Sequence, residues 1–412
     1  MPNFTKHPHF PHRYIDTNKL LPLLIGALGF IIAIYLESRS FAFGFLLATF
    51  VVYSILYHKL WKHILLGLAA LATILIIIII FFKGDSSLGR LLIYKISFRL
   101  YAEHWLSGIG LGNFKQRYLY EQAEYFSGKA FTAKEQLLAD NTYFAFNDYW
   151  QFIIETGIFG MLALSLTCYL IITIIRKAIR TNGYILYKSI AILFLIAILT
   201  AALFTHVFEK SIFWIITIFL LSFLFCASSG KNGRRIVFMW ISIALLAITG
   251  TISLGNYLVN ENYEQSLKLY AAGLIGECKK ELEKKQPIKE EKRAVLYMQS
   301  LMAYHSPEHE KVLVALIRDY PNANNYKLLG DFYTQNNNFK DAEKSYLMAI
   351  NMVPNRFVSR KALLDLYVAY KSHAKAKRVA EIILSLAIKV DSYQVRKIKL
   401  EAAKFLSKTN SL

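Results

Sequence analysis

The chain has 412 residues, 55% of them hydrophobic, and a formal net charge of +20 at pH 7. So much apolar sequence, gathered into long runs, excludes an ordinary soluble protein and predicts a membrane protein. The charge does not predict nucleic-acid binding, because much of it falls in short segments between the apolar runs, where membrane topology accounts for it. Three cysteines do not make a disulfide framework.

Apolar runs of roughly 17–25 residues can cross a bilayer as helices. Seven runs of this kind are predicted to do so: Leu20–Leu36, Phe41–Tyr57, Ile64–Phe82, Phe152–Ile175, Ser189–Phe208, Ile212–Ala227 and Ile236–Leu254. Helices are the expected form because lipid offers no partner to unpaired backbone groups. The first run lacks a small-residue cleavage site, so we expect an uncleaved anchor.

Basic residues are concentrated in three of the segments between these runs. They are Lys59 and Lys62, then Arg176, Lys177, Arg180 and Lys188, then Lys231, Arg234 and Arg235. The positive-inside rule places these segments in the cytoplasm. The polar loop 83–150 and everything after residue 254 are then expected on the outer side.

The sequence predicts an all-α protein with three regions: a membrane domain at 1–254 that includes the outer loop 83–150, a charged helical connector at 255–290, and a helical domain at 291–412. In the last region one set of residues has the spacing of a tetratricopeptide repeat, and a weaker copy follows it. The first set is Tyr326, Leu329, Gly330, Tyr333, Ala342, Tyr346, Ala349 and Pro354, and the copy is Leu363, Tyr367, Ala376 and Ala380. Stacked repeats of this kind form an α-solenoid whose curved surface usually binds a protein partner, although it could instead brace the membrane domain.

The outer loop has a basic first part, 83–117, and an acidic remainder. Such a loop could bind an anion with its basic part and accept or donate a proton with its acidic part. The fork of an arginine side chain suits a pyrophosphate. Gly108, Gly110 and Gly112 allow tight turns. They follow a helical stretch rather than a strand, so a dinucleotide-binding fold is not expected. An alternative is that the helix around Arg90 merely lies at the membrane interface with snorkelling arginines.

The loop and the span after it resemble the signature region of the O-antigen ligase/polymerase family over about residues 85–230. That pattern is an arginine, an aromatic residue four positions later, a GxGxGNF turn, a polar motif, and a span that opens with Gln and Glu-Thr-Gly. The matching residues here are Arg90, Tyr94, Gly108–Phe114, Asn147–Tyr149, Gln151 and Glu155–Gly157.

The resemblance implies a multi-pass protein of the bacterial inner membrane that transfers a glycan on the periplasmic side. The implied donor is a polyprenyl-diphosphate-linked glycan, and the acceptor is lipid A core, a protein or a growing glycan. Neither a metal nor another cofactor is implied. Ligase and polymerase share the donor and differ in the acceptor, so the sequence does not separate them.

The resemblance also implies roles for single residues. Arg90 matches the family arginine proposed to neutralise the diphosphate. Its expected helpers are Arg99 or Arg117, with Gly110, Gly112 and Asn113 shaping the backbone around the donor. Asn147 and Asp148 would orient or deprotonate the acceptor hydroxyl.

The identity of the general base is open, because this chain has Phe146 where the family often has a histidine. Asp148 is the first candidate and Glu155 the second, although an acidic residue in the first turn of a helix is also simply favourable. His206 with Glu209 is the third, and His206 could equally be an interfacial histidine.

Relatives usually carry more spans before the outer loop than the three predicted here. This departure favours a second hypothesis, a membrane-anchored adaptor for a cell-envelope glycan assembly complex that has no catalysis of its own. Removing residues 291–412 is expected to abolish the function of an adaptor, whereas an enzyme would keep residual glycan transfer. A transporter or channel fits less well, because the spans contain few charges and no paired half-helices.

Overall fold

A computed structural model describes residues 17–57, 84–128, 131–181, 183–228, 232–285, 288, 290–303 and 309–410. Every regular element within these ranges is a helix, which confirms the predicted all-α polytopic bundle. The chain divides into two compact units. The first contains Met1–Thr73 and Leu166–Thr249, and the second contains Ile74–Ser165 and Gly250–Leu412.

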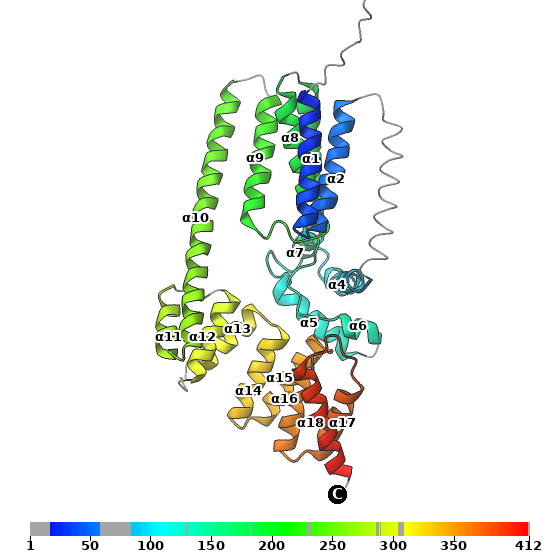
Figure 1. Cartoon of the computed structure of the whole chain (residues 1–412), viewed down its shortest axis with the longest axis vertical. Coiled ribbons are helices and arrows are strands. Elements are labelled where there is room, and N and C mark those ends of the chain that lie inside the picture. Colours follow the sequence, from blue (N-terminus) through cyan, green and yellow to red (C-terminus); the bar gives the residue numbers. More distant parts are fainter. Residues whose placement is uncertain are drawn as a thin grey trace, which may run out of the picture. The chain divides into compact units, whose positions relative to one another are not determined.

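The first unit is an apolar helix bundle. It holds α1 (Thr17–Tyr35), α2 (Arg39–Leu56), the second half of α7 (Asp148–Arg180), α8 (Ile185–Ala201), α9 (Ser211–Ser228) and the first part of α10 (Asn232–Ala271). Helix α8 packs against α1, α2 and α9 (Figure 1). A Cβ atom on Gly44 would lie 2.4 Å from the carbonyl oxygen of Ala197, so the missing side chain lets two helices approach closely, as is common in lipid.

Five described helices are long and apolar enough to cross a membrane, namely α1, α2, α7, α9 and the part of α10 at Met239–Ala271. They correspond to five of the predicted spans. A sixth, predicted at Ser189–Phe208, is the shorter apolar helix α8, which ends at Ala201. The predicted span Ile64–Phe82 lies outside the described residues.

The second unit contains the outer loop and the C-terminal helices. Its elements are α4 (Gly84–Glu103), α5 (Phe114–Ser127), α6 (Ala133–Leu138), the first half of α7, the end of α10, α11 (Ile275–Glu283), α12 (Glu291–Ala303), α13 (His309–Asp319), α14 (Ala323–Gln335), α15 (Phe339–Met352), α16 (Phe357–Ala369), α17 (His373–Ser385) and α18 (Tyr393–Asn410). Each helix from α14 to α18 packs on the next one in the chain (Figure 1).

The residues of the predicted repeat lie at the contacts between these helices. A Cβ atom on Gly330 would lie 2.4 Å from Cε1 of Tyr346, so glycine is needed for α14 to lie on α15. Ala342 and Ala349 are fully buried, and the corresponding Ala376 and Ala380 of α17 are buried as well. The region therefore consists of closely packed helix pairs, while its assignment to the tetratricopeptide class stays a prediction.

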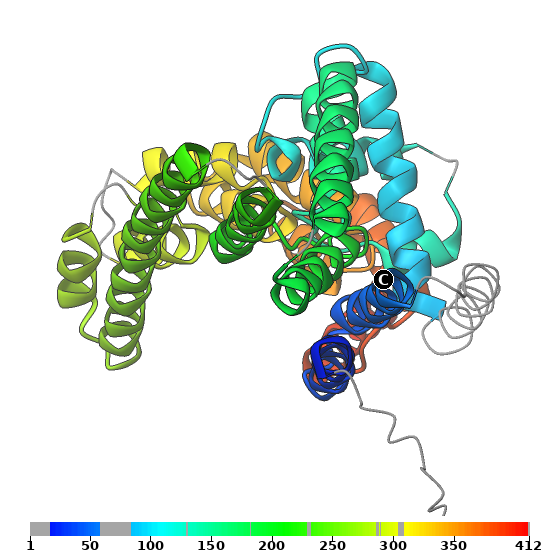
Figure 2. The same cartoon turned by 90° about the horizontal axis from the view of Figure 1, so that it is seen from above.

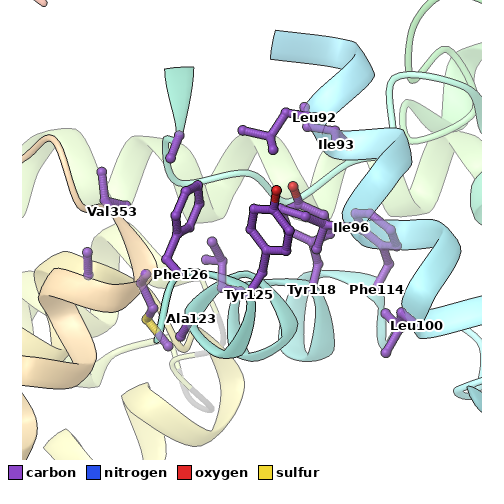
Figure 3. Packing of buried hydrophobic residues seen from close by; sticks show 14 of the residues in the cluster. Leu92, Ile93, Ile96, Leu100, Phe114, Tyr118, Ala123, Tyr125, Phe126 and Val353 are labelled. Atoms are coloured by element: carbon purple, nitrogen blue, oxygen red, sulfur yellow. The ribbon is translucent and has the colours of Figure 1, made fainter. Parts of the chain in front are cut away.

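One hydrophobic core joins the outer loop to the C-terminal helices. Leu92, Ile96 and Leu100 of α4 pack against Phe114 and Tyr118 of α5. Ala349, Met352 and Val353, from the end of α15, belong to the same buried cluster (Figure 3). These segments are more than 200 residues apart in the sequence, and each buries part of the other's apolar surface.

Candidate functional site

The glycine-rich turn after α4 is locked against a kink in α7. Gly108, Gly110 and Gly112 have φ values of +70°, +94° and +76°, in the left-handed region that favours glycine. A Cβ atom on Gly108 would lie 2.3 Å from the carbonyl oxygen of Glu155. On α7, Gly157 has φ 64° and ψ −145°, and a Cβ atom there would lie 2.5 Å from the carbonyl oxygen of Leu106. Only glycine fits where the two backbones meet.

Backbone hydrogen bonds then cross between the turn and the kink. The amides of Ile109 and Gly110 donate to the carbonyls of Ile154 and Glu155, at 3.1 and 2.9 Å. In return, the amide of Ile158 donates to the carbonyl of Trp105 at 2.9 Å. We call residues 105–114 together with 154–158 the glycine clamp. The kink frees helix carbonyls that the turn then satisfies.

The carboxylate of Glu155 completes the clamp. Its Oε2 accepts a hydrogen bond from the amide of Gly112 at 2.9 Å, and its Oε1 accepts from the amide of Phe114 at 3.3 Å and from Nε2 of Gln151 at 3.2 Å. Glu155 is buried, and a buried carboxylate is tolerated where donors surround it. Because Phe114 opens α5, the carboxylate also faces the positive end of that helix.

The predicted donor-binding residues of the turn are therefore engaged inside the protein. The amides of Gly110 and Gly112 donate to Glu155, and the side-chain amide of Asn113 donates to the carbonyl of Ile109 at 3.0 Å. In this arrangement they hold the end of α4 to the start of α5.

Asn147 connects α7 to the helix that carries Arg90. Its Oδ1 accepts from the amide of Trp150 at 3.0 Å, which caps the start of α7. Its side chain also hydrogen-bonds the hydroxyl of Tyr94. Burial raises the pKa of Tyr94, against the opposing effects of the Arg90 charge and this hydrogen bond.

Aromatic side chains align α4 with the first half of α7, and the two helices run side by side (Figure 2). The indole of Trp150 stacks on Phe98 with ring centroids 6.4 Å apart, and its Nε1 donates to Ser97 at 2.9 Å. Phe146 has a φ of 53°, and the guanidinium of Arg90 lies 5.5 Å from the centre of its ring. Phe146 thus makes a cation–π contact with the predicted arginine.

Arg90 lines a cavity of about 320 Å³. The lining residues are Gly89, Arg90, Leu92, Ile93, Gln122, Leu138, Ala139, Asp140, Thr142, Phe146 and Lys389. Two of them are cations and one is a carboxylate. Lys389 lies between α17 and α18, 299 residues beyond Arg90, and nothing in its local sequence marks it as part of this site.

The other two predicted arginines do not line the Arg90 cavity. Arg99 is nine residues after Arg90, which turns it about half-way around the helix. Its Nε lies 3.3 Å from Oε1 of Glu121, and its guanidinium lies 5.7 Å from the ring centre of Tyr125. Burial raises the pKa of Glu121, and the Arg99 charge opposes that rise. Arg117 is exposed on α5.

The candidate bases fall into different surroundings. Asp148 is half-buried at the first position of α7, next to Asn147. Glu155 is held in the glycine clamp, as described above. His206 and Glu209 belong to the first unit, where they lie in the turn between α8 and α9 with Nε2 and Oε2 3.6 Å apart. The structure tests none of these residues as a base, so each remains a prediction.

Comparison with protein families agrees with the expected resemblance. Residues 24–165 match the family model described as O-antigen ligase. The matched range contains Arg90, the glycine clamp and Asn147, and it stops within α7. Over this range the chain is similar to that family, and the likeness supports the transfer of a glycan to an acceptor in general. Comparison with curated proteins gave no match.

Proposed function

We propose that this protein transfers a glycan from a polyprenyl diphosphate to an acceptor on the periplasmic face of a bacterial inner membrane. The observation that carries the proposal is the position of Arg90 in a cavity, within the segment that matches the O-antigen ligase family. Lipid A core, a protein or a growing glycan remain the candidate acceptors.

Arg90 would bind the diphosphate that leaves. During transfer the bond between the terminal sugar carbon and the diphosphate oxygen breaks, and negative charge grows on the diphosphate. A guanidinium stabilises that charge through two parallel hydrogen bonds. One such donor contributes about 3–4 kcal/mol to lowering a barrier of this kind. The contact with Phe146 would hold the guanidinium at the cavity wall.

The acceptor hydroxyl would attack the sugar carbon as the diphosphate departs, and its proton would pass to a carboxylate. Asp148 is the preferred base, because it adjoins Asn147 and because the oxygens of Glu155 already accept three hydrogen bonds. Asn147 would orient the acceptor. Glu155 and the pair His206–Glu209 stay as the second and third candidates.

The test is a surface-glycan profile of a strain that lacks the gene and is complemented with variants. Arg90→Ala is expected to reduce transfer by about 10²–10³-fold, because it removes one charge-stabilising donor. Asp148→Asn is expected to reduce it as well. Arg378→Ala, which changes an exposed arginine of α17, is the matched control and should transfer normally.

Immunoblots of the membrane fraction would show that each variant is inserted. Accumulated lipid-linked glycan in the Arg90→Ala strain would support a transferase, and shortened chains would identify a polymerase. A normal surface-glycan profile in the Arg90→Ala strain would contradict the proposal. Loss of transfer with Glu155→Gln but not with Asp148→Asn would identify Glu155 as the base, provided that the Glu155→Gln protein is folded.

A membrane-anchored adaptor is the second candidate, and one observation favours it. A cavity of about 670 Å³ lies among α10, α12, α14 and α16, with Tyr263, Gln299, Asn325 and Lys327 among its lining residues. A cavity between helical pairs suits a partner protein. Adaptor function would survive Arg90→Ala and would be lost when this cavity is blocked.

Removal of residues 291–412 would not separate the two functions, contrary to the expectation from sequence. The outer loop and the C-terminal helices share a core, and Nε2 of Gln122 donates to the carbonyl of Met352 at 2.5 Å. The truncation would expose that core to solvent and remove the hydrogen-bond partner of Gln122 in the outer loop. An enzyme and an adaptor would then both be inactive, so point variants are needed.

A further inference from the structure

The cavity around Arg90 has an excess of positive charge, and half of that charge comes from the C-terminal helices. Its charged lining residues are Arg90, Lys389 and Asp140. A diphosphate carries at least two negative charges, and a single arginine fork matches one phosphate group. A second cation on the same cavity would match the other group.

We propose that Lys389 is this second cation, so that the C-terminal helices complete the binding site for the donor diphosphate. The inference rests on the proposed function, since it assigns the Arg90 cavity to the donor. It gives the C-terminal region a direct part in substrate binding, beside any recruitment of a partner.

Lys389 is held beside the cavity by an exchangeable ion pair. Its Nζ lies 3.2 Å from Oδ2 of Asp140, and Nη2 of Arg356 lies 3.2 Å from Oδ1 of the same carboxylate. Asp140 is 54% exposed and Lys389 38% exposed, and exposed pairs of this kind are weak. A phosphate group can therefore take the place of the carboxylate on Lys389.

The backbone around Lys389 is fixed in place. Nζ of Lys399 on α18 donates to the carbonyls of Leu384 and Leu386, at 3.1 and 2.9 Å. A cation on a segment that is already ordered loses less conformational entropy when it binds a ligand.

Residues 136–140, three of which line the cavity, are held by the C-terminal region as well. Nδ2 of Asn355 donates to the carbonyls of Gln136, Leu137 and Ala139, at 3.2, 2.7 and 2.6 Å. Nε2 of Gln122 donates to the carbonyl of Asp140 at 3.1 Å as well as to Met352. The wall that carries Asp140 is thus bound to the region that carries Lys389.

The test measures equilibrium binding to the full-length protein in detergent, with farnesyl diphosphate and farnesyl monophosphate as probes. Lys389→Ala is expected to weaken binding of the diphosphate by about 5–20-fold and binding of the monophosphate by much less. Lys389→Arg should stay within about 3-fold of the wild type, because it keeps the charge. Asp140→Asn should bind the diphosphate more tightly, because a competing carboxylate is gone.

Lys397→Ala, which removes an exposed lysine of α18, is the matched control and should bind both probes as the wild type does. A structural role for Lys389 would weaken both probes equally and lower the melting temperature, and that result overturns the inference. Weaker binding with Arg90→Ala but not with Lys389→Ala would overturn it too, while the proposed function would stand. Normal glycan transfer by the Arg90→Ala strain would remove the proposed function itself.

Discussion

The glycine clamp and the Arg90 cavity lie in the same unit, yet they use their polar groups differently. In the clamp, the amide of Gly110 donates to the backbone carbonyl of Glu155, and the amide of Gly112 donates to the Glu155 carboxylate. At the cavity, two cations outnumber one carboxylate, and Arg90 contacts the ring of Phe146. The clamp therefore fixes the backbone, and the cavity is left to bind an anion.

The largest effect is expected where the clamp is tightest. Gly108→Ala would place a Cβ atom 2.3 Å from the carbonyl oxygen of Glu155 at a φ of +70°. Strain and clash together should destabilise the protein by roughly 3 kcal/mol or more. Thermal unfolding in detergent would measure the loss.

Gly112→Ala is the matched control for that variant. Its φ is +76°, but no atom lies within 4 Å of the added Cβ. We expect a loss of only about 1 kcal/mol, from the backbone strain alone. Equal losses at the two glycines would show that the close approach of Gly108 to α7 does not stabilise the fold.

The second effect concerns the contact that joins the cavity wall to the C-terminal helices. Asn355→Ala removes the donor to three carbonyls of residues 136–139, which should cost about 1–3 kcal/mol. Transfer should fall too, because Leu138 and Ala139 of this segment line the Arg90 cavity. Asn351→Ala, a half-buried position on α15, is the comparison. Chemical unfolding and a transfer assay on the same samples would show whether stability and activity fall together.

The third effect separates two arginines of α4. Arg99→Ala leaves the buried carboxylate of Glu121 without its partner and should destabilise the protein by about 1–2 kcal/mol, with little change in diphosphate affinity. Arg90→Ala should instead weaken binding of the diphosphate and change the stability little. A loss of affinity with Arg99→Ala, at unchanged stability, would contradict the division between a paired and a ligand-binding arginine.

The smallest effect is a pH dependence at Glu135 of α6, which forms an ion pair with Lys95 of α4. Burial acts to raise the pKa of Glu135, but hydrogen bonds from Lys95, Thr132 and Tyr125 outweigh it and hold this pKa at about 2. A carboxylate with a lowered pKa stabilises the fold above its unfolded pKa of about 4.3, and the gain disappears as the pH falls toward 2.

Glu135→Gln should therefore lower the free energy of unfolding by about 1 kcal/mol at pH 7, a value reduced by the half-exposed position of Lys95. The difference from the wild type should shrink between pH 4.5 and pH 2. Unfolding curves across that range would check it. A difference that stays constant with pH would mean that the ionised carboxylate is not what stabilises this contact.

Much of the fold follows from local sequence. Apolar runs predicted the spans, and the GxGxGNF pattern predicted tight turns at glycines that do have positive φ values. The spacing of Gly330, Ala342 and Tyr346 indicated close helix pairs, and these residues do lie where α14 meets α15. These rules work because helix period and backbone preference act over a few residues.

The candidate site was predicted only in part. Arg90 and Tyr94 lie near Asn147, whereas Arg99 lies on another face of α4 and pairs with Glu121, and the roles of these residues stay predictions. Glu155 could be read as a base or as a helix-end residue from sequence alone. Its three hydrogen bonds depend on how the turn at Gly112 meets α7, which no local pattern records.

The sequence by itself determined an all-helical membrane protein, a glycine turn and an arginine one helical turn before an aromatic residue. Only the tertiary structure decided that Lys389 and Arg90 line one cavity and that Asn355 holds residues 136–139 beside it. Helix period and turn chemistry are local, so they can be read from neighbouring residues. The meeting of residues 299 positions apart depends on a shared core that the whole chain must fold to create.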